Sequence, residues 1–76
     1  MSPGALASVG PGVREIRIHT EGAYRVFYVA AFEEAIYVLH AFEKKTRKTA
    51  ARHLEIGRQR FRALVQMRQH EKKRNR

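Results

Sequence analysis

The sequence contains no cysteine and no tryptophan, and it has only two prolines. Without cysteine the chain can form neither disulfides nor thiolate metal sites, which fits a protein of the reducing cytoplasm. It also lacks any apolar run close to the roughly 20 residues that a membrane span needs. Residues 1–12 do not combine a basic start with a long apolar stretch, so they do not resemble a signal peptide. We therefore expect a cytoplasmic protein that does not contact a membrane.

The chain is short and contains few acidic residues. Seventy-six residues allow a single domain, and a chain of this size buries only about 60% of its unfolded surface. Seven acidic residues face 16 lysines and arginines, which gives a net charge of +9. Residues 1–42 contain three of these basic residues and four acidic ones, whereas residues 43–76 contain thirteen and three. Because lysine and arginine bind phosphates, we expect a nucleic-acid partner for the second half.

Hydrophobic periodicity predicts three strands. Residues 1–12 show no regular period and are predicted to be a flexible lead-in. Residues 13–20 alternate apolar and polar side chains, as in a half-buried strand, and Gly22 suits the tight turn that follows. The β-branched and aromatic residues 24–31 predict a second strand. Residues 35–42 predict a third, which we expect to be central because it is nearly all apolar.

The pattern then changes to that of a helix. Residues 43–49 form a basic connector, and apolar residues return at helical spacing over residues 50–69. Gly57 within this helix is expected to cost about 1 kcal/mol relative to alanine. Residues 70–76 are predicted to be a basic, frayed tail. The predicted domain, residues 13–69, is therefore α+β: an antiparallel three-stranded meander followed by a C-terminal helix.

One helix cannot cover both faces of a sheet. We therefore expect Val26, Tyr28 and Ala30 to lie on an uncovered face, which implies missing structure, a partner, or both.

Four basic residues are predicted to meet at one place. Cleavage of RNA by its own 2′-hydroxyl needs a proton acceptor, cations around the phosphate and a proton donor for the leaving oxygen. Arg17 and Arg25 flank the first turn symmetrically, so antiparallel pairing can bring them together on one face. Lys44 and Lys45 follow the third strand, and crowded ammonium groups lower one another's pKa. The alternative is that these are ordinary solvated strand and loop residues.

Other candidate groups give weaker signals. His40 lies in an apolar strand, where a hydrogen-bonded core histidine is the commoner outcome. The other three histidines have no partner spacing, and the three tyrosines suit packing better than base stacking. The chain has no phosphate-binding glycine loop, no zinc-ligand spacing and no Ser/His/Asp set. The residues by themselves support a small basic binding domain.

Three phrases carry a family resemblance. They are E-I-R at Glu15–Arg17, Y-R-V-x-Y at Tyr24–Tyr28, and L-H-A-F-x-K-K-T at Leu39–Thr46. Over residues 9–65 the chain resembles the phage-derived HigB-like branch of the RelE/ParE toxin superfamily. The resemblance implies the toxin of a type II toxin–antitoxin pair, a metal-independent endoribonuclease without a cofactor. Its implied partners are messenger RNA on the ribosome and a HigA-like helix-turn-helix antitoxin. The alternatives are a non-catalytic remnant that binds RNA or antitoxin, and a ParE-like gyrase inhibitor.

The resemblance also assigns residues. Arg25 matches the arginine that contacts the scissile phosphate in relatives, and Arg17 lies in a strand where relatives place basic catalytic groups. Lys44 and Lys45 match a basic pair after the last strand, and His40 belongs to the same motif. Further RNA contacts are expected from four basic side chains: Arg14, Arg47, Lys48 and Arg52.

The chain departs from the family pattern at three places. Relatives begin with a strand and a pair of helices before the E-I-R strand, and this chain does not. The resemblance thus implies an N-terminally truncated member, through a late start codon in the gene model or a real deletion. Ala50 stands where relatives have proline and Gly57 where alanine is common, and both changes weaken the helix.

Overall fold

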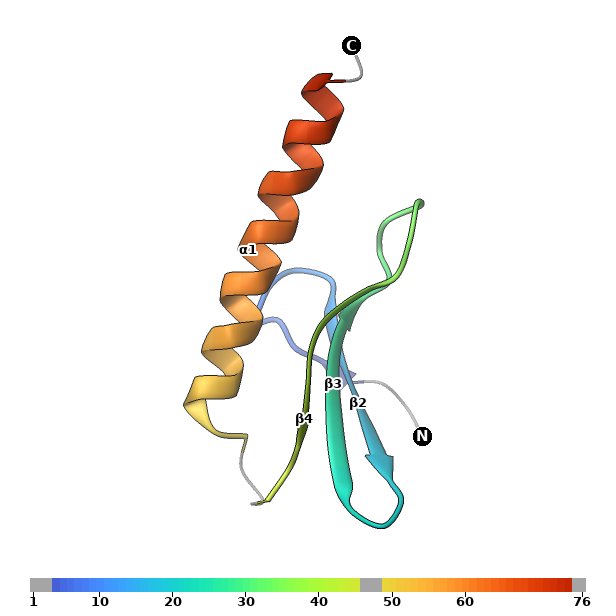
Figure 1. Cartoon of the computed structure of the whole chain (residues 1–76), viewed down its shortest axis with the longest axis vertical. Coiled ribbons are helices and arrows are strands. Elements are labelled where there is room, and N and C mark those ends of the chain that lie inside the picture. Colours follow the sequence, from blue (N-terminus) through green and yellow to red (C-terminus); the bar gives the residue numbers. More distant parts are fainter. Residues whose placement is uncertain (1–3, 46–48, 75–76) are drawn as a thin grey trace.

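The computed structural model describes residues 4–45 and 49–74. Its elements in chain order are β1 (Gly4–Ala5), β2 (Val13–His19), β3 (Ala23–Val29), β4 (Tyr37–Glu43) and α1 (Ala51–Arg74). The strands form one antiparallel sheet in the order β1-β2-β3-β4, and α1 runs beside it, nearest to β4 (Figure 1). The predicted α+β class, with a meander before a C-terminal helix, is confirmed, and the two-residue β1 is added to it.

The core lies between the sheet and the helix. Alternation in β2 and β3 turns one set of side chains toward α1, since successive strand residues face opposite sides. This set and the apolar stripe of α1 form a small buried cluster: Val9, Val13, Phe27, Val29, Leu39 and Leu64. The exclusion of these side chains from water is the main force that holds the helix on the sheet.

The segment before β2 is part of this core. Residues 1–12 were expected to be a flexible lead-in, but over residues 4–12 the chain forms β1 and a turn, and it buries Val9. The lack of a side chain at Gly57 lets this segment pack closely on the helix. A Cβ atom at Gly57 would lie 3.0 Å from the ring of Phe27 and 3.2 Å from Val9. The glycine that was expected to weaken the helix therefore allows close packing between helix, sheet and N-terminal turn.

The third predicted strand is not central. The strand order places β4 at an edge of the sheet, so that expectation is wrong. β4 is apolar because one of its faces packs on α1, while Val38 on the other face stays 64% exposed. The pairing of β4 with β3 shifts register between Phe27 and Tyr28, which leaves Leu39 as an extra residue. At this bulge both Leu39, in the core, and His40, against the Phe27 ring, lie on the helix side.

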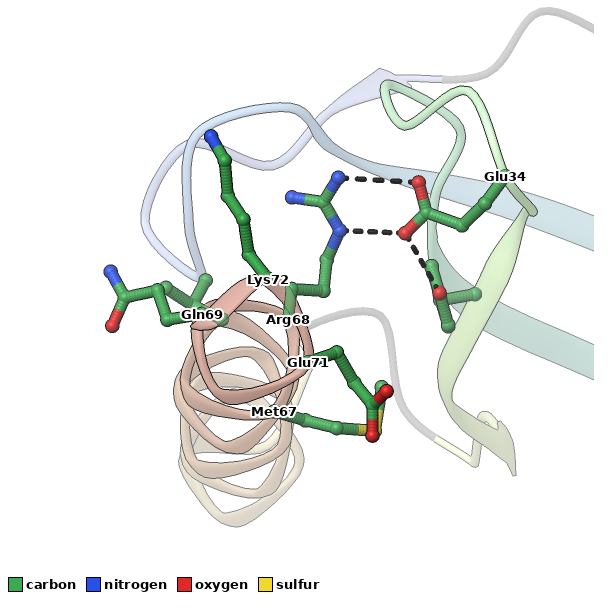
Figure 2. Close-up of a pocket in the computed structure, with 8 residues that line it drawn as sticks. Glu34, Met67, Arg68, Gln69, Glu71 and Lys72 are labelled. Atoms are coloured by element: carbon green, nitrogen blue, oxygen red, sulfur yellow. Dashed lines mark hydrogen bonds and ion pairs between the residues drawn. The ribbon is translucent and has the colours of Figure 1, made fainter. Parts of the chain in front are cut away.

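The helix continues beyond its predicted end. It was expected to stop near residue 69 and to be followed by a frayed tail, but α1 ends at Arg74. Arg68 donates two hydrogen bonds to Glu34 in the β3–β4 loop, at 2.7 and 3.2 Å (Figure 2). Its guanidinium also stacks on the Phe32 ring. The bonds from Arg68, together with a backbone hydrogen bond of Glu34 and the hydrogen bond from the Tyr37 hydroxyl, lower the pKa of the Glu34 carboxyl to about 2. The ion pair thus ties the late turns of the helix to the sheet.

The face of the sheet away from α1 has no cover among the described residues. Ile18, Tyr24 and Val38 are exposed there, and Val26 and Tyr28 are half-buried. The expectation of an uncovered sheet face is therefore confirmed. In residues 4–45 and 49–74, no helix combines the length and the apolar character that crossing a membrane requires.

Candidate functional site

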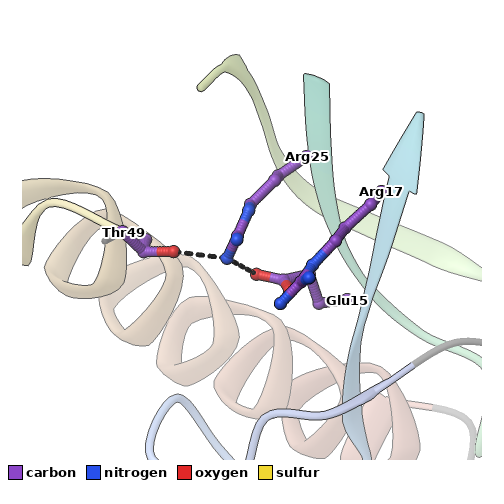
Figure 3. Close-up of polar contacts among 4 residues, drawn as sticks. All are labelled: Glu15, Arg17, Arg25 and Thr49. Carbon is purple, nitrogen blue, oxygen red and sulfur yellow. Dashed lines mark hydrogen bonds and ion pairs between the residues drawn. The ribbon is translucent and has the colours of Figure 1, made fainter. Parts of the chain in front are cut away.

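A buried ion pair forms the base of the site. Arg25 on β3 is 6% exposed and Glu15 on β2 is 9% exposed. Nη1 of Arg25 donates to Oε2 of Glu15 at 2.9 Å and to the hydroxyl of Thr49 at 2.6 Å (Figure 3). Because Thr49 lies just before α1, one guanidinium connects both strands of the hairpin to the start of the helix. Its Nε is buried and has no partner within the described residues.

Two more accessible cations lie beside this pair. Arg17 is the direct Cα partner of Arg25 across the hairpin, and its side chain is 60% exposed. Lys44 follows β4, where its N–H donates to the carbonyl of Ala23 at 2.7 Å. Together with Arg25 they line a hollow of about 70 Å³. Burial and the charges of Arg25 and Arg17 lower the pKa of Lys44, while Glu15 opposes this change.

A wider groove continues from Lys44 along the start of α1. Its volume is about 320 Å³, and its basic lining residues are Lys44, Lys45 and Arg52. Lys44 therefore belongs to both the hollow and the groove. We call the two depressions together the basic track; the carboxylate of Glu43 also lines the groove. A track of this kind suits a phosphate backbone better than a single anion, because its charges are spread along its length.

His53 forms part of the groove wall, and His40 lies behind it. Nε2 of His40 lies 2.9 Å from Nδ1 of His53, and His53 also lines the groove. The Phe42 ring stacks on His53, with centroids 3.8 Å apart and planes 8° apart. Burial lowers the pKa of His40, assisted by the charges of His53 and Arg60. Burial and the charge of Arg52 lower the pKa of His53 as well. Near neutral pH both rings are therefore uncharged.

The structure brings some of the predicted site residues together and separates others. Arg17, Arg25 and Lys44 meet at the hollow, whereas Lys45 lies farther along in the groove. His40 is behind His53 rather than at the track itself.

The residues expected to contact RNA are also divided. Arg52 lines the groove as expected. Arg14 alternates with Glu15 along β2 and so faces the uncovered side of the sheet, away from the track. Arg47 and Lys48 lie outside the described residues.

Sequence reasoning missed Glu15, Thr49 and His53. The position of Glu15 could have been predicted from the sequence. A residue two positions from Arg17 lies on the same face of the strand, and so beside Arg25 on the neighbouring strand. Thr49 and His53 reach the site only because the helix packs on the sheet, and no local pattern predicts that.

Residues 3–62 match the family described as phage derived protein Gp49-like (DUF891). The chain belongs to this family. The matched region contains the whole basic track and the histidine pair. No curated protein and no solved structure matches the chain.

Proposed function

We propose that this Gp49-like protein is the toxin of a type II toxin–antitoxin pair and cleaves messenger RNA on the ribosome, as RelE and HigB-like toxins do. The observation behind the proposal is the convergence of Arg17, Arg25 and Lys44 at a hollow, with Lys44 also lining the neighbouring groove. Membership of the Gp49-like family and the resemblance of the strand motifs support it. The proposal includes a helix-turn-helix antitoxin, HigA-like, that neutralises the chain.

The chemistry assigned to the hollow is transfer of a phosphodiester to the neighbouring 2′-oxygen. The 2′-hydroxyl gives up its proton, its oxygen attacks phosphorus, and the bond from phosphorus to the 5′-oxygen breaks. The leaving 5′-oxygen takes a proton from water, so the products are a 2′,3′-cyclic phosphate and a free 5′-hydroxyl. Lys44 is the proposed acceptor of the 2′ proton, because its lowered pKa favours the neutral amine that can take it. Arg17 is the proposed partner for the charge that grows on the phosphate oxygens.

Arg25 has a different part in this proposal. The resemblance assigns it a direct phosphate contact, but its Nη1 is already bonded to Glu15 and Thr49, and the residue is almost wholly buried. We therefore assign Arg25 to positioning. It holds the start of α1 against the hairpin, and its charge lowers the pKa of Lys44. Lys45 and Arg52 are proposed to bind the neighbouring phosphates of the RNA.

Substitution of Lys44 by arginine tests the proposal. Arginine keeps the charge but stays protonated, so RNA binding should persist while cleavage falls by about 10²–10⁴-fold. Arg17→Ala should weaken both, and Arg62→Ala is the control, since it removes an exposed helix charge outside the basic track. Each variant is induced in cells, and messages are mapped by primer extension. Full, codon-phased cleavage by Lys44→Arg would show that Lys44 is not the base.

A second candidate is a protein that binds RNA without cutting it. The Glu15–Arg25 ion pair favours this reading, because Glu15 neutralises one of the three cations and also lies 3.4 Å from Arg17. Intact messages in induced cells, together with RNA binding by the purified protein, would support it. Intact messages with damaged DNA would instead indicate a ParE-like action on gyrase.

A further inference from the structure

The histidine pair is part of a longer chain of polar contacts. Nη1 of Arg60 on α1 donates to the carbonyl of Leu39 at 2.9 Å and lies 3.4 Å from Nδ1 of His40. The other ring nitrogen of His40 faces Nδ1 of His53. The contacts therefore run in order from Arg60 through His40 to His53, whose remaining nitrogen, Nε2, is on the ring edge opposite His40. Because His40 occupies Nδ1, Nε2 is the nitrogen of His53 left for a ligand in the groove that this residue lines.

These contacts favour one direction of donation. A guanidinium has only donors, so its contact with His40 favours the tautomer in which Nδ1 of His40 is the acceptor. A neutral His40 then has its proton on Nε2 and donates it to Nδ1 of His53. With Nδ1 used as an acceptor, a neutral His53 has its own proton on Nε2. The opposite arrangement would place a His40 N–H against the Arg60 N–H.

We propose that His53 donates a hydrogen bond from Nε2–H to a phosphate oxygen of the RNA in the groove, and that Arg60 holds it in this form through His40. The identity of the ligand rests on the proposed function. The tautomer does not, because it follows from the contacts within the chain. Neither ring is then free to accept a proton from a substrate.

The surroundings of the two rings agree with this assignment. Phe42 stacks on His53 and fixes the plane of its ring, which a directional donor requires. The charged groups that line the groove with His53 are Arg52 on α1, Lys44, Lys45 and the carboxylate of Glu43, and Arg60 faces His40. The four cations outweigh the one carboxylate, so on balance they disfavour a positive charge on either ring and attract an anion to the groove. His40 thereby becomes a positioning residue rather than a base.

The tautomers can be read directly by nitrogen NMR of the histidine side chains. In the wild type both rings should carry the proton on Nε2. Arg60→Met removes the donor that faces His40, so the pKa of His40 should rise and the Nδ1–H form should become populated. Nδ1–H rings in the wild type, or an Arg60→Met spectrum and titration like those of the wild type, would overturn the inference.

The donor role needs a ligand, and inorganic phosphate is the first probe. Addition of phosphate should shift the His53 side-chain resonances, and a His53 that does not respond would refute the donor role. The second probe is a labelled single-stranded RNA with 2′-O-methyl groups, which cannot be cleaved through the 2′-oxygen. His53→Phe keeps a flat ring on Phe42 but has no N–H, and should weaken binding about tenfold. His53→Gln restores an N–H donor and should bind more tightly than His53→Phe; equal affinities would also refute the donor role.

These measurements separate the two proposals. If His53 responds to phosphate but the protein never cleaves messages, the donor role of His53 stands and the proposed nuclease activity is refuted. If His53→Phe cleaves messages in the codon-phased pattern with unaltered rate and RNA affinity, the nuclease activity stands and the donor role is refuted.

Discussion

Replacement of Arg25 by alanine is the sharpest test of how this fold is held together. The change removes the group that donates to Glu15 at 2.9 Å and to Thr49 at 2.6 Å. The Glu15 carboxylate stays buried, and its remaining contact is Arg17 at 3.4 Å. Removal of one partner from a buried ion pair typically costs about 3–5 kcal/mol. Because Arg17 offers partial compensation, we expect a loss of about 3 kcal/mol in the free energy of unfolding.

That loss is large for a chain of this size. At about 0.05–0.15 kcal/mol per residue, a protein of 76 residues has a total stability of about 4–11 kcal/mol. The assay is urea unfolding followed by circular dichroism. With an m-value of about 1.5 kcal/mol/M, the midpoint should fall by about 2 M.

A double variant supplies the control. Glu15→Leu combined with Arg25→Met removes both charges and fills the space with apolar side chains, so it should recover most of the stability lost in Arg25→Ala. If Arg25→Ala unfolds at the wild-type midpoint, or if the double variant is no more stable than the single one, the buried ion pair does not hold the fold in this way. The result also bears on function, because loss of toxicity in Arg25→Ala would then report on folding as well as on the site.

Three further predictions concern pH, packing and the end of the helix. The pKa values of His40 and His53 are lowered from 6.5 in the folded protein, so below that pH the unfolded chain binds more protons than the folded one. Thermal stability should therefore fall as the pH is lowered from about 7 to about 5. The fall should be smaller in a His40→Asn/His53→Asn variant. Gly57→Ala should lose about 1 kcal/mol in urea unfolding instead of gaining it, because the new methyl group would lie 3.0 Å from a core ring; a stabilised variant would contradict this. Arg68→Gln should speed amide hydrogen exchange in the last turns of α1, since it breaks the double contact with Glu34; unchanged exchange there would show that the ion pair does not hold the helix end.

Local sequence patterns predicted three of the four strands, the helix and their order, but not β1. Alternation over residues 13–20 and 24–31 predicted a hairpin, and the symmetry of the turn around Gly22 predicted the pairing of Arg17 with Arg25 that the structure shows. The apolar spacing of the last third predicted the helix, although not its length. These features follow from contacts between near neighbours in the chain, where the period of 2 or about 3.6 residues acts directly.

The composition of the site depends on how the helix packs on the sheet. The bulge at Leu39 turns His40 toward the helix, and the packing of α1 brings His53 and Thr49 to β4 and Arg25. Thr49 and Arg25 are 24 positions apart, and hydrophobic periodicity says nothing about which turn of a helix meets which strand. That choice depends on close packing, such as the contact at Gly57, and on burial of the Glu15–Arg25 pair. Charge could be counted from the sequence, but which cations are exposed and which are already paired depends on the fold.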